Sequence, residues 1–368
     1  MAKSHLHELT ERGQSVWFDT LSRDLVHTGE LARMMDDDAV TGVTSNPTIF
    51  QKALSEGNAY DAQLKGLLGT TDDPTEIFFS LALDDIRDAC DVLRPAFDAS
   101  GGADGFVSME VEPGIAYDTT RSFEQARWIA SEVARPNLYV KIPATEPGLP
   151  AIEDCIAHGT PINITLIFSL ERYAAVVEAY LRGLERLVAG GGDPSPVVSV
   201  ASFFVSRVDT EADKRLDALG RQELQGKLAV ANAKLAYQHY LEAFSGPRWD
   251  YLAGKGARVQ RCLWASTSTK NPAYNDVMYV EDLIGPDTVN TMPLETIEAF
   301  QDHGRVPGDT VLEGVDEAHR LLDDLAAAGV DYDDVTTTLE AEGVQKFADS
   351  FEQIMDSVRA KRGALQAA

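Results

Sequence analysis

The chain has 368 residues, 44% of them hydrophobic, which is enough to bury a sizeable core. Its formal net charge is −27 and its pI is about 4.5, and an acidic surface of this kind argues against nucleic acid or anionic membranes as partners. The sequence contains no stretch of roughly 18 consecutive apolar residues. A polar N-terminus and three widely spaced cysteines predict a cytoplasmic protein with reduced thiols.

Short runs rich in β-branched and aromatic residues alternate with longer amphipathic stretches along the chain. Such runs are typical of buried parallel strands, because both faces of those strands are covered. The expected strands are residues 15–20, 41–46, 105–111, 138–144, 161–168, 197–204, 261–267 and 287–293. Strands in this number, separated by helices, predict an α/β fold: a (β/α)8 barrel of the TIM type that forms one domain over residues 1–368.

Helical patterns fill the intervals and continue beyond the last strand. Segment 47–99 is expected to hold two or three helices, and an amphipathic stretch runs from Glu211 to Phe244. A C-terminal extension of about 312–368 is expected to be helical, including helices over 315–329 and 344–365.

Polar residues recur near the C-terminal ends of the expected strands. Those ends form the active-site face of a (β/α)8 barrel, so the polar side chains are expected to converge on one pocket. They are Asp19, Asn46, Glu110, Lys141, Asn163, Thr165 and Ser202, with Phe204 on the same strand face as Ser202.

Lys141 stands out because it lies in the middle of the apolar run LYVKI. Desolvation lowers the pKa of a buried amine, which makes its neutral and nucleophilic form accessible near neutral pH. A neutral amine forms a Schiff base with a carbonyl, and the protonated imine stabilises a carbanion on the adjacent carbon. This chemistry suits an aldol cleavage or addition. Asp19 and Glu110 are the carboxylates available for proton transfer, and Thr165 could hold a water between them.

Seven motifs, in this order along the chain, resemble those of the transaldolase family. They are GVTSNPTIF, VSMEVEPGIAYDT, NLYVKIPAT, INITLIFS, SFFVSRVD, WASTSTKNPAY and TMPLETIEAF. The resemblance covers about Val16 to Phe300. It implies a class I aldolase of the pentose phosphate pathway that moves a dihydroxyacetone unit from sedoheptulose 7-phosphate to glyceraldehyde 3-phosphate. The reaction needs no metal or organic cofactor, because the imine replaces a Lewis acid.

The resemblance also implies a role for each matching residue. Lys141 matches the Schiff-base lysine and Asp19 the acid/base aspartate, while Glu110 and Thr165 match the pair that works through a catalytic water. Asn46 and Asn163 match residues that hold the dihydroxyacetone unit, and Ser202 and Phe204 match the wall beside the substrate. Arg207 matches a phosphate-binding arginine. A second cation is expected after the seventh strand, where ASTSTKN is two residues longer than the family's pattern and offers Lys270.

Each residue also has a simpler structural explanation. Asp19 could cap the following helix, Glu112 could replace Glu110 after a register slip, and Asn163 and Thr165 could bond only to neighbouring backbone. Arg207 and Lys270 could be surface charges. At the level of the whole protein, the alternatives are a fructose 6-phosphate aldolase and a catalytically silent barrel that acts as a binding protein. No histidine group shows metal-ligand spacing, and the chain is expected to act as a monomer or homodimer.

Overall fold

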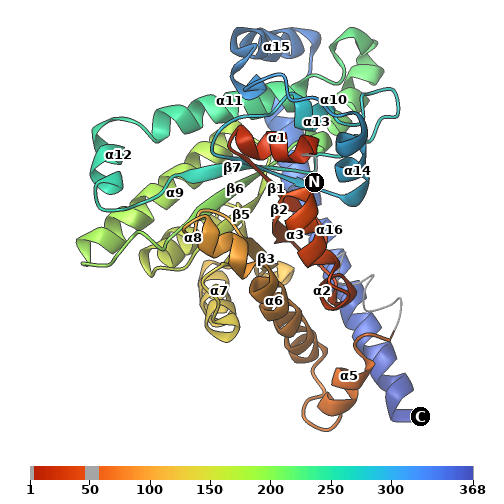
Figure 1. The fold of residues 1–368 in the computed structure, drawn as a ribbon. Coiled ribbons are helices and arrows are strands. Elements are labelled where there is room, and N and C mark those ends of the chain that lie inside the picture. The colour runs from red at the N-terminus through yellow and green to blue at the C-terminus, as the bar shows by residue number, and fades with distance from the viewer. Residues whose placement is uncertain (1–3, 46–57, 368) are drawn as a thin grey trace.

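The structure is a computed structural model that describes residues 4–45 and 58–367. Within these residues, parallel strands form a closed barrel in the order β1 to β8, with each strand beside its neighbour in sequence (Figure 1). The strands are β1 (Gln14–Phe18), β2 (Val40–Thr44), β3 (Phe106–Glu110), β4 (Leu138–Pro143), β5 (Ile162–Ile167), β6 (Ser199–Phe204), β7 (Gln260–Ala265) and β8 (Thr288–Met292). Both ends of every strand lie within two residues of the expected ones, so the predicted (β/α)8 barrel is confirmed.

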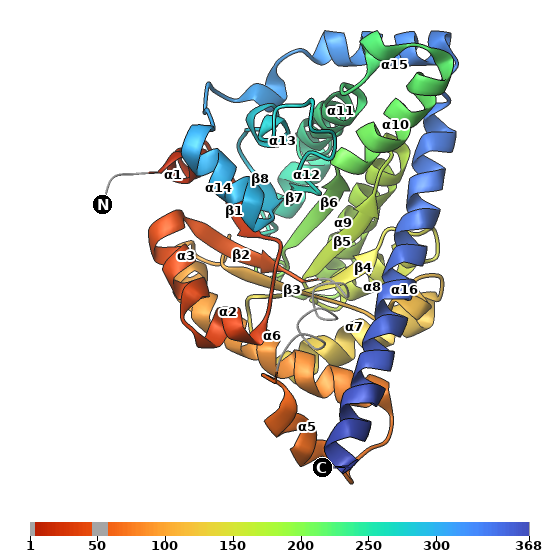
Figure 2. The ribbon, with the colours of Figure 1, turned by 90° about the vertical axis from the view of Figure 1, so that its right-hand side faces the viewer.

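Helices surround the barrel, and α5 and the end of α16 project beyond it (Figures 1 and 2). None of those in the described part of the chain is both long and apolar enough to cross a bilayer. The α-helices are α1 (His5–Glu11), α2 (Arg23–His27), α3 (Glu30–Asp38), α5 (Asp61–Leu67), α6 (Pro74–Ala99), α7 (Thr119–Val133), α8 (Gly148–Ala157), α9 (Leu170–Ala189), α10 (Ser206–Leu219), α11 (Leu228–Ala243), α12 (Gly246–Ala253), α13 (Met278–Glu281), α14 (Leu294–His303), α15 (Val315–Ala328) and α16 (Tyr332–Ala367). Short 3₁₀ turns are η1 (Pro113–Ile115), η2 (Gln222–Leu224) and η3 (Thr310–Leu312).

The amphipathic stretch expected from Glu211 to Phe244 is not one continuous helix. Helix α10 ends at Leu219, and Gly220 follows in the left-handed region at φ 69°. A residue without a Cβ adopts this conformation readily, and it ends a helix by turning the chain away from the axis. The 3₁₀ turn η2 separates α10 from α11, so the amphipathic stretch is divided between two helices.

The C-terminal extension contains α15 and α16, and α16 is a single helix of 36 residues that begins at Tyr332 rather than at residue 344. It runs past the barrel from the α10 side to α5 (Figure 2). Ion pairs fasten it along the way: Arg172 on α9 pairs with Glu340 at 3.3 Å, and Arg215 on α10 pairs with Asp334 at 2.6 Å. The apolar face of α16 is buried, so the helix is a fixed part of the fold.

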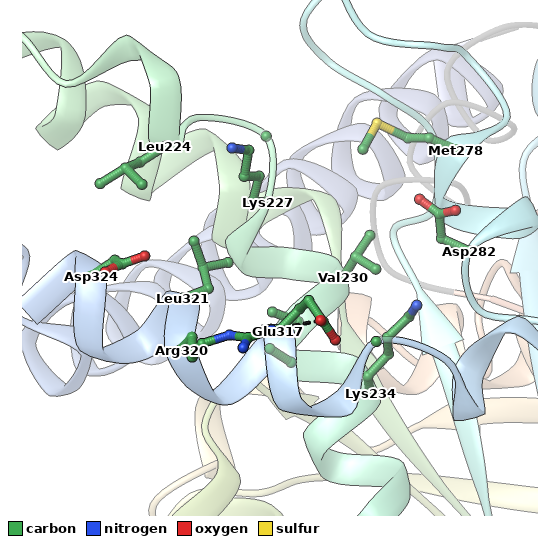
Figure 3. Close-up of a pocket in the computed structure, with 14 residues that line it drawn as sticks. Leu224, Lys227, Val230, Lys234, Met278, Asp282, Glu317, Arg320, Leu321 and Asp324 are labelled. Atoms are coloured by element: carbon green, nitrogen blue, oxygen red, sulfur yellow. Dashed lines mark hydrogen bonds and ion pairs between the residues drawn. The ribbon is translucent and has the colours of Figure 1, made fainter.

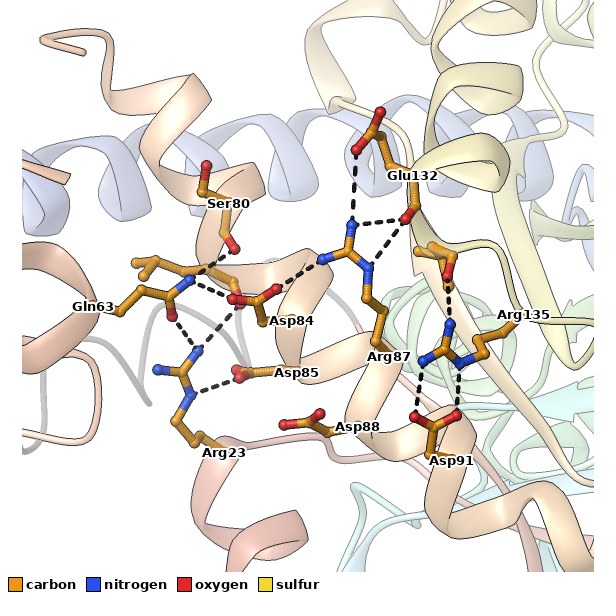
Figure 4. Close-up of polar contacts among 12 residues, drawn as sticks. Arg23, Gln63, Ser80, Asp84, Asp85, Arg87, Asp88, Asp91, Glu132 and Arg135 are labelled. Atoms are coloured by element: carbon orange, nitrogen blue, oxygen red, sulfur yellow. Dashed lines mark hydrogen bonds and ion pairs between the residues drawn. The ribbon is translucent and has the colours of Figure 1, made fainter. Parts of the chain in front are cut away.

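Segment 47–99 supplies α5 and α6, which a polar network joins to each other and to α2 (Figure 4). Arg23 on α2 donates to Asp85 on α6 at 2.7 Å and to Gln63 on α5 at 2.7 Å. Tyr60 also donates to Asp85 at 2.7 Å. The Asp85 side chain is 1% exposed, so its charge depends on these donors.

Candidate active site

Lys141 lies on β4 at the same level as two other polar residues of the barrel. The strand register places it beside Glu110 on β3 and Asn163 on β5. Its Nζ donates to the backbone oxygen of Ser45 at 3.2 Å and lies 3.8 Å from Glu110 Oε2. The side chains of Lys141 and Glu110 are 8% and 5% exposed. A buried charge needs a partner, and Glu110 supplies it.

The environment of Glu110 differs from that of an ordinary buried ion pair. Burial raises its pKa to about 6, while the charge of Lys141 acts in the opposite direction and that of Asp19 adds to the rise. Neither carboxylate oxygen of Glu110, nor the Thr165 hydroxyl, accepts or donates a hydrogen bond within the described residues. Buried polar groups are usually satisfied, so these atoms are available to a substrate hydroxyl or a water. Glu112 lies outside the strand, near Arg121, and is not the residue beside Lys141.

Asp19 follows β1 and faces a cavity at the C-terminal end of the barrel. Its Oδ1 accepts a hydrogen bond from Thr44 on β2 at 2.6 Å. Burial raises its pKa, and the Thr44 hydrogen bond and the charges of Lys141 and Arg207 oppose that rise. Asp19 does not cap the next helix, because Ser22 accepts the hydrogen bond from Leu25 at the start of α2.

The cavity beside Asp19 has a volume of about 200 Å³. Seven of the ten predicted site residues line it, and they come from β4, β5 and β6, from α10 and from the segments that follow β1 and β7. They are Asp19, Lys141, Thr165, Ser202, Phe204, Arg207 and Lys270. Glu110 and Asn163 lie behind this lining, next to Lys141 in the register. The tenth residue, Asn46, lies outside the described residues.

Asn163 is fully buried and bonded on both sides. Its Oδ1 accepts a hydrogen bond from Ser202 at 2.7 Å, and its Nδ2 donates to Ser108 Oγ at 3.0 Å. These bonds fix the orientation of the amide beside Lys141. The alternative that Asn163 bonds only to neighbouring backbone is therefore wrong, because both partners of its amide are side chains.

The two cations predicted to bind phosphate lie at the outer part of the cavity. Arg207 is the second residue of α10, with its guanidinium carbon 5.1 Å from the centre of the Phe204 ring. Lys270 Nζ donates to Ser268 Oγ at 2.5 Å. Neither forms an ion pair with a carboxylate of the described residues. In a chain of net charge −27, two such cations at one cavity favour an anionic ligand.

The long loop after β7, which carries Lys270, is fastened to α10, which carries Arg207. Tyr274 donates to Asp213 at 2.6 Å, and Tyr279 donates to Asp209 at 2.7 Å. Asp209 also accepts from the backbone nitrogen of Ala229 at 2.7 Å. These bonds explain how a loop of unexpected length still brings Lys270 to the cavity.

Several cavity residues escaped the sequence analysis. Thr44 and Thr291 form a hydroxyl pair at 2.9 Å beside Asp19, and both occupy strand ends, where a search for hydroxyls could have found them. Phe347 comes from α16, in the C-terminal extension, and no strand pattern points to it.

A larger cavity lies away from the strand ends, between α11 and α15 (Figure 3). Its volume is about 490 Å³, and it contains none of the predicted site residues. Lys227 and Lys234 at its edge donate to backbone oxygens of Glu223 and Glu313. Because Lys141, Asp19 and the other polar residues of the strand ends line the smaller cavity, that cavity is the candidate active site.

Comparison with known proteins agrees with this geometry. The sequence model described as transaldolase/fructose-6-phosphate aldolase matches residues 16–358. The chain is 51% identical over 362 residues to a transaldolase of Parafrankia sp. (strain EAN1pec), covering 98% of each chain. It is 52% identical over 355 residues to a transaldolase of Acidothermus cellulolyticus, covering 96% of this chain and 95% of the other. It is 49% identical over 359 residues to transaldolase 2 of Streptomyces coelicolor, covering 97% and 96%. The chain therefore belongs to the transaldolase/fructose-6-phosphate aldolase family.

Proposed function

We propose that the chain is a transaldolase in which Lys141 carries a dihydroxyacetone unit from sedoheptulose 7-phosphate to glyceraldehyde 3-phosphate. The products are erythrose 4-phosphate and fructose 6-phosphate. The observation that carries the proposal is the buried amine of Lys141, which lines a strand-end cavity with Asp19 and lies beside Glu110. Family membership and the names of full-length relatives support the same activity.

The reaction begins when Lys141 passes its proton to the ionised Glu110, whose Oε2 lies 3.8 Å from Nζ, and the amine then attacks the C2 carbonyl of the donor. The resulting carbinolamine loses its hydroxyl as water, with a proton supplied by Glu110 through a water held near Thr165, and a protonated imine forms. Glu110 suits this task because its pKa of about 6 lets it both release and accept a proton near neutral pH.

Carbon–carbon cleavage follows at the C3–C4 bond. Asp19 takes the proton of the C4 hydroxyl, the aldose phosphate leaves as an aldehyde, and the electron pair of the broken bond passes into the imine to give an enamine. Attack of the enamine on the acceptor aldehyde forms the new bond, and Asp19 returns its proton to the new hydroxyl. Hydrolysis of the imine then frees Lys141, so no external cofactor is required.

Substrate binding uses the remaining residues around the cavity. Arg207 and Lys270 bind the phosphate, while Asn163 and Ser202 orient hydroxyl groups and Phe204 forms a wall. Asn46 is assigned to the dihydroxyacetone unit on the family resemblance alone. We further propose that the enzyme is cytoplasmic and that residues 1–368 form one catalytic domain with a helical C-terminal extension.

Two alternatives remain distinguishable. A fructose 6-phosphate aldolase would use the same lysine, and the family model covers both activities, but the relatives named above are transaldolases over nearly their whole length. A silent binding protein would not need a lysine and two carboxylates around one cavity.

The test is acceptor dependence. With fructose 6-phosphate alone, a transaldolase keeps the enamine on Lys141 and releases little free dihydroxyacetone. Adding erythrose 4-phosphate should then give sedoheptulose 7-phosphate and glyceraldehyde 3-phosphate at a much higher rate. Steady release of dihydroxyacetone without any acceptor would identify an aldolase, and the absence of both reactions in folded protein would leave the silent barrel.

A further inference from the structure

We propose that Lys346 on α16 is a third phosphate-binding cation of this cavity, acting together with Arg207 and Lys270. The inference rests on the proposed function, and it assigns part of substrate recognition to the C-terminal helix rather than to the barrel.

Helix α16 reaches the cavity because of a close approach at Gly343. A Cβ at this position would lie 2.9 Å from Leu166 Cδ2, at the end of β5. A side chain at position 343 would push against the end of the Leu166 side chain, so the glycine lets the helix lie close to β5. Phe168, two residues after Leu166, packs against Phe204 with 5.2 Å between the ring centres, and the Arg207 guanidinium lies over the Phe204 ring. Gly343 therefore brings α16 against the wall that carries Arg207.

Lys346 and Phe347 follow Gly343 by three and four residues, which places all three on one face of the helix. Phe347 is buried and lines the same cavity as Arg207 and Lys270. Lys346, beside it, is exposed, so its long side chain can reach the cavity from the rim.

The electrostatic environment of Lys346 agrees with this placement. Repulsion from Arg207 is the largest cause that lowers the pKa of Lys346, followed by burial and by repulsion from Lys270. No carboxylate of the described residues forms an ion pair with Lys346, Arg207 or Lys270. The charges of Asp19 and, to a smaller extent, Glu342 act on Arg207 without forming an ion pair with it.

Like charges repel when they are brought together without a counter-ion, so such an arrangement favours binding of an anion. A phosphate monoester suits it, because it carries close to two negative charges at neutral pH and has three acceptor oxygens. The cations come from three elements: the start of α10, the loop after β7, and α16. A phosphate that bridges these cations is therefore bound by both the barrel and its C-terminal extension.

The experiment compares K346M with R359M. Both variants remove one cation from α16, but Arg359 pairs with Asp356 on the exposed side of the helix. The variant K346R tests rescue by a conservative change. Two quantities are measured: the affinity for inorganic phosphate, by calorimetry and by competitive inhibition, and the borohydride-trapped yield of imine from dihydroxyacetone, which carries no phosphate.

We expect K346M to weaken phosphate affinity roughly fivefold, as for loss of one charge-assisted contact at a partly exposed site. R359M should change it less than twofold, and K346R should restore most of it. The loss of phosphate affinity in K346M should exceed any loss of trapped imine. Equal phosphate affinities for K346M and R359M would overturn the assignment. Failure of the wild-type protein to trap dihydroxyacetone would count against the proposed function instead, while calorimetry would still decide the role of Lys346.

Discussion

The ionisation of Glu110 should shape the pH dependence of the reaction. Its pKa of about 6 lies above the ordinary value of 4.5, because burial outweighs the attraction of Lys141. The shift corresponds to about 2 kcal/mol of preference for the neutral carboxyl in the folded protein. Roughly nine-tenths of the carboxyl is ionised at pH 7 and about one-tenth at pH 5. If the ionised form accepts the proton, kcat/KM should fall about tenfold between these values.

The assay is the pH profile of kcat/KM for the wild type and for E110Q, with folding checked at each pH. The glutamine keeps the shape of the side chain but cannot titrate. We expect E110Q to be slower by about 10²- to 10⁴-fold and to lose the acid limb centred near pH 6. Retention of that limb in E110Q would refute the assignment and point to Asp19, whose pKa is also raised by burial. The variant D19N, examined in the same way, separates the two carboxylates.

Two further predictions concern stability. Burial raises the pKa of Asp209 to about 7 from 3.8, so its contribution to stability is complete below pH 3.8 and is lost as the pH rises through 7. Relative to D209N, the wild type should therefore lose about 4 kcal/mol of unfolding free energy between pH 4 and pH 8. The free energy is measured by urea unfolding at each pH, and the same pH dependence in both proteins would contradict the prediction. The variant R23M removes the guanidinium beside the buried carboxylate of Asp85 and should cost about 3–5 kcal/mol, whereas R23M with D85N should cost clearly less than the sum of the single changes. Strict additivity in urea unfolding would show that Arg23 and Asp85 are not coupled.

The barrel could be predicted from the sequence because each strand is short, apolar on both faces and bounded by turn residues. Once strand positions are right, parallel pairing brings strand ends to one face, so the convergence of Asp19, Lys141 and Thr165 follows. The register that sets Glu110 rather than Glu112 beside Lys141 came from the structure, since a shift of two residues keeps the same strand face.

Contacts between distant segments were the part that the sequence did not reveal. Phe347 and Lys346 belong to an amphipathic helix whose pattern indicates which face is buried but not what that face covers. The break at Gly220 was missed because apolar spacing continues on either side of it, although a glycine within a helical pattern is a common end signal. The Asp209 and Asp213 bonds that hold the loop of Lys270 join residues about 60 to 70 positions apart.

The most direct test of the account is to trap the intermediate on Lys141. The protein is incubated with fructose 6-phosphate, reduced with borohydride, digested and analysed by mass spectrometry. The account predicts one reduced adduct, on the peptide that contains Lys141, and its loss in K141M that binds substrate and is folded. An adduct on another lysine, or none in folded wild-type protein that binds the substrate, would contradict the Schiff-base role of Lys141.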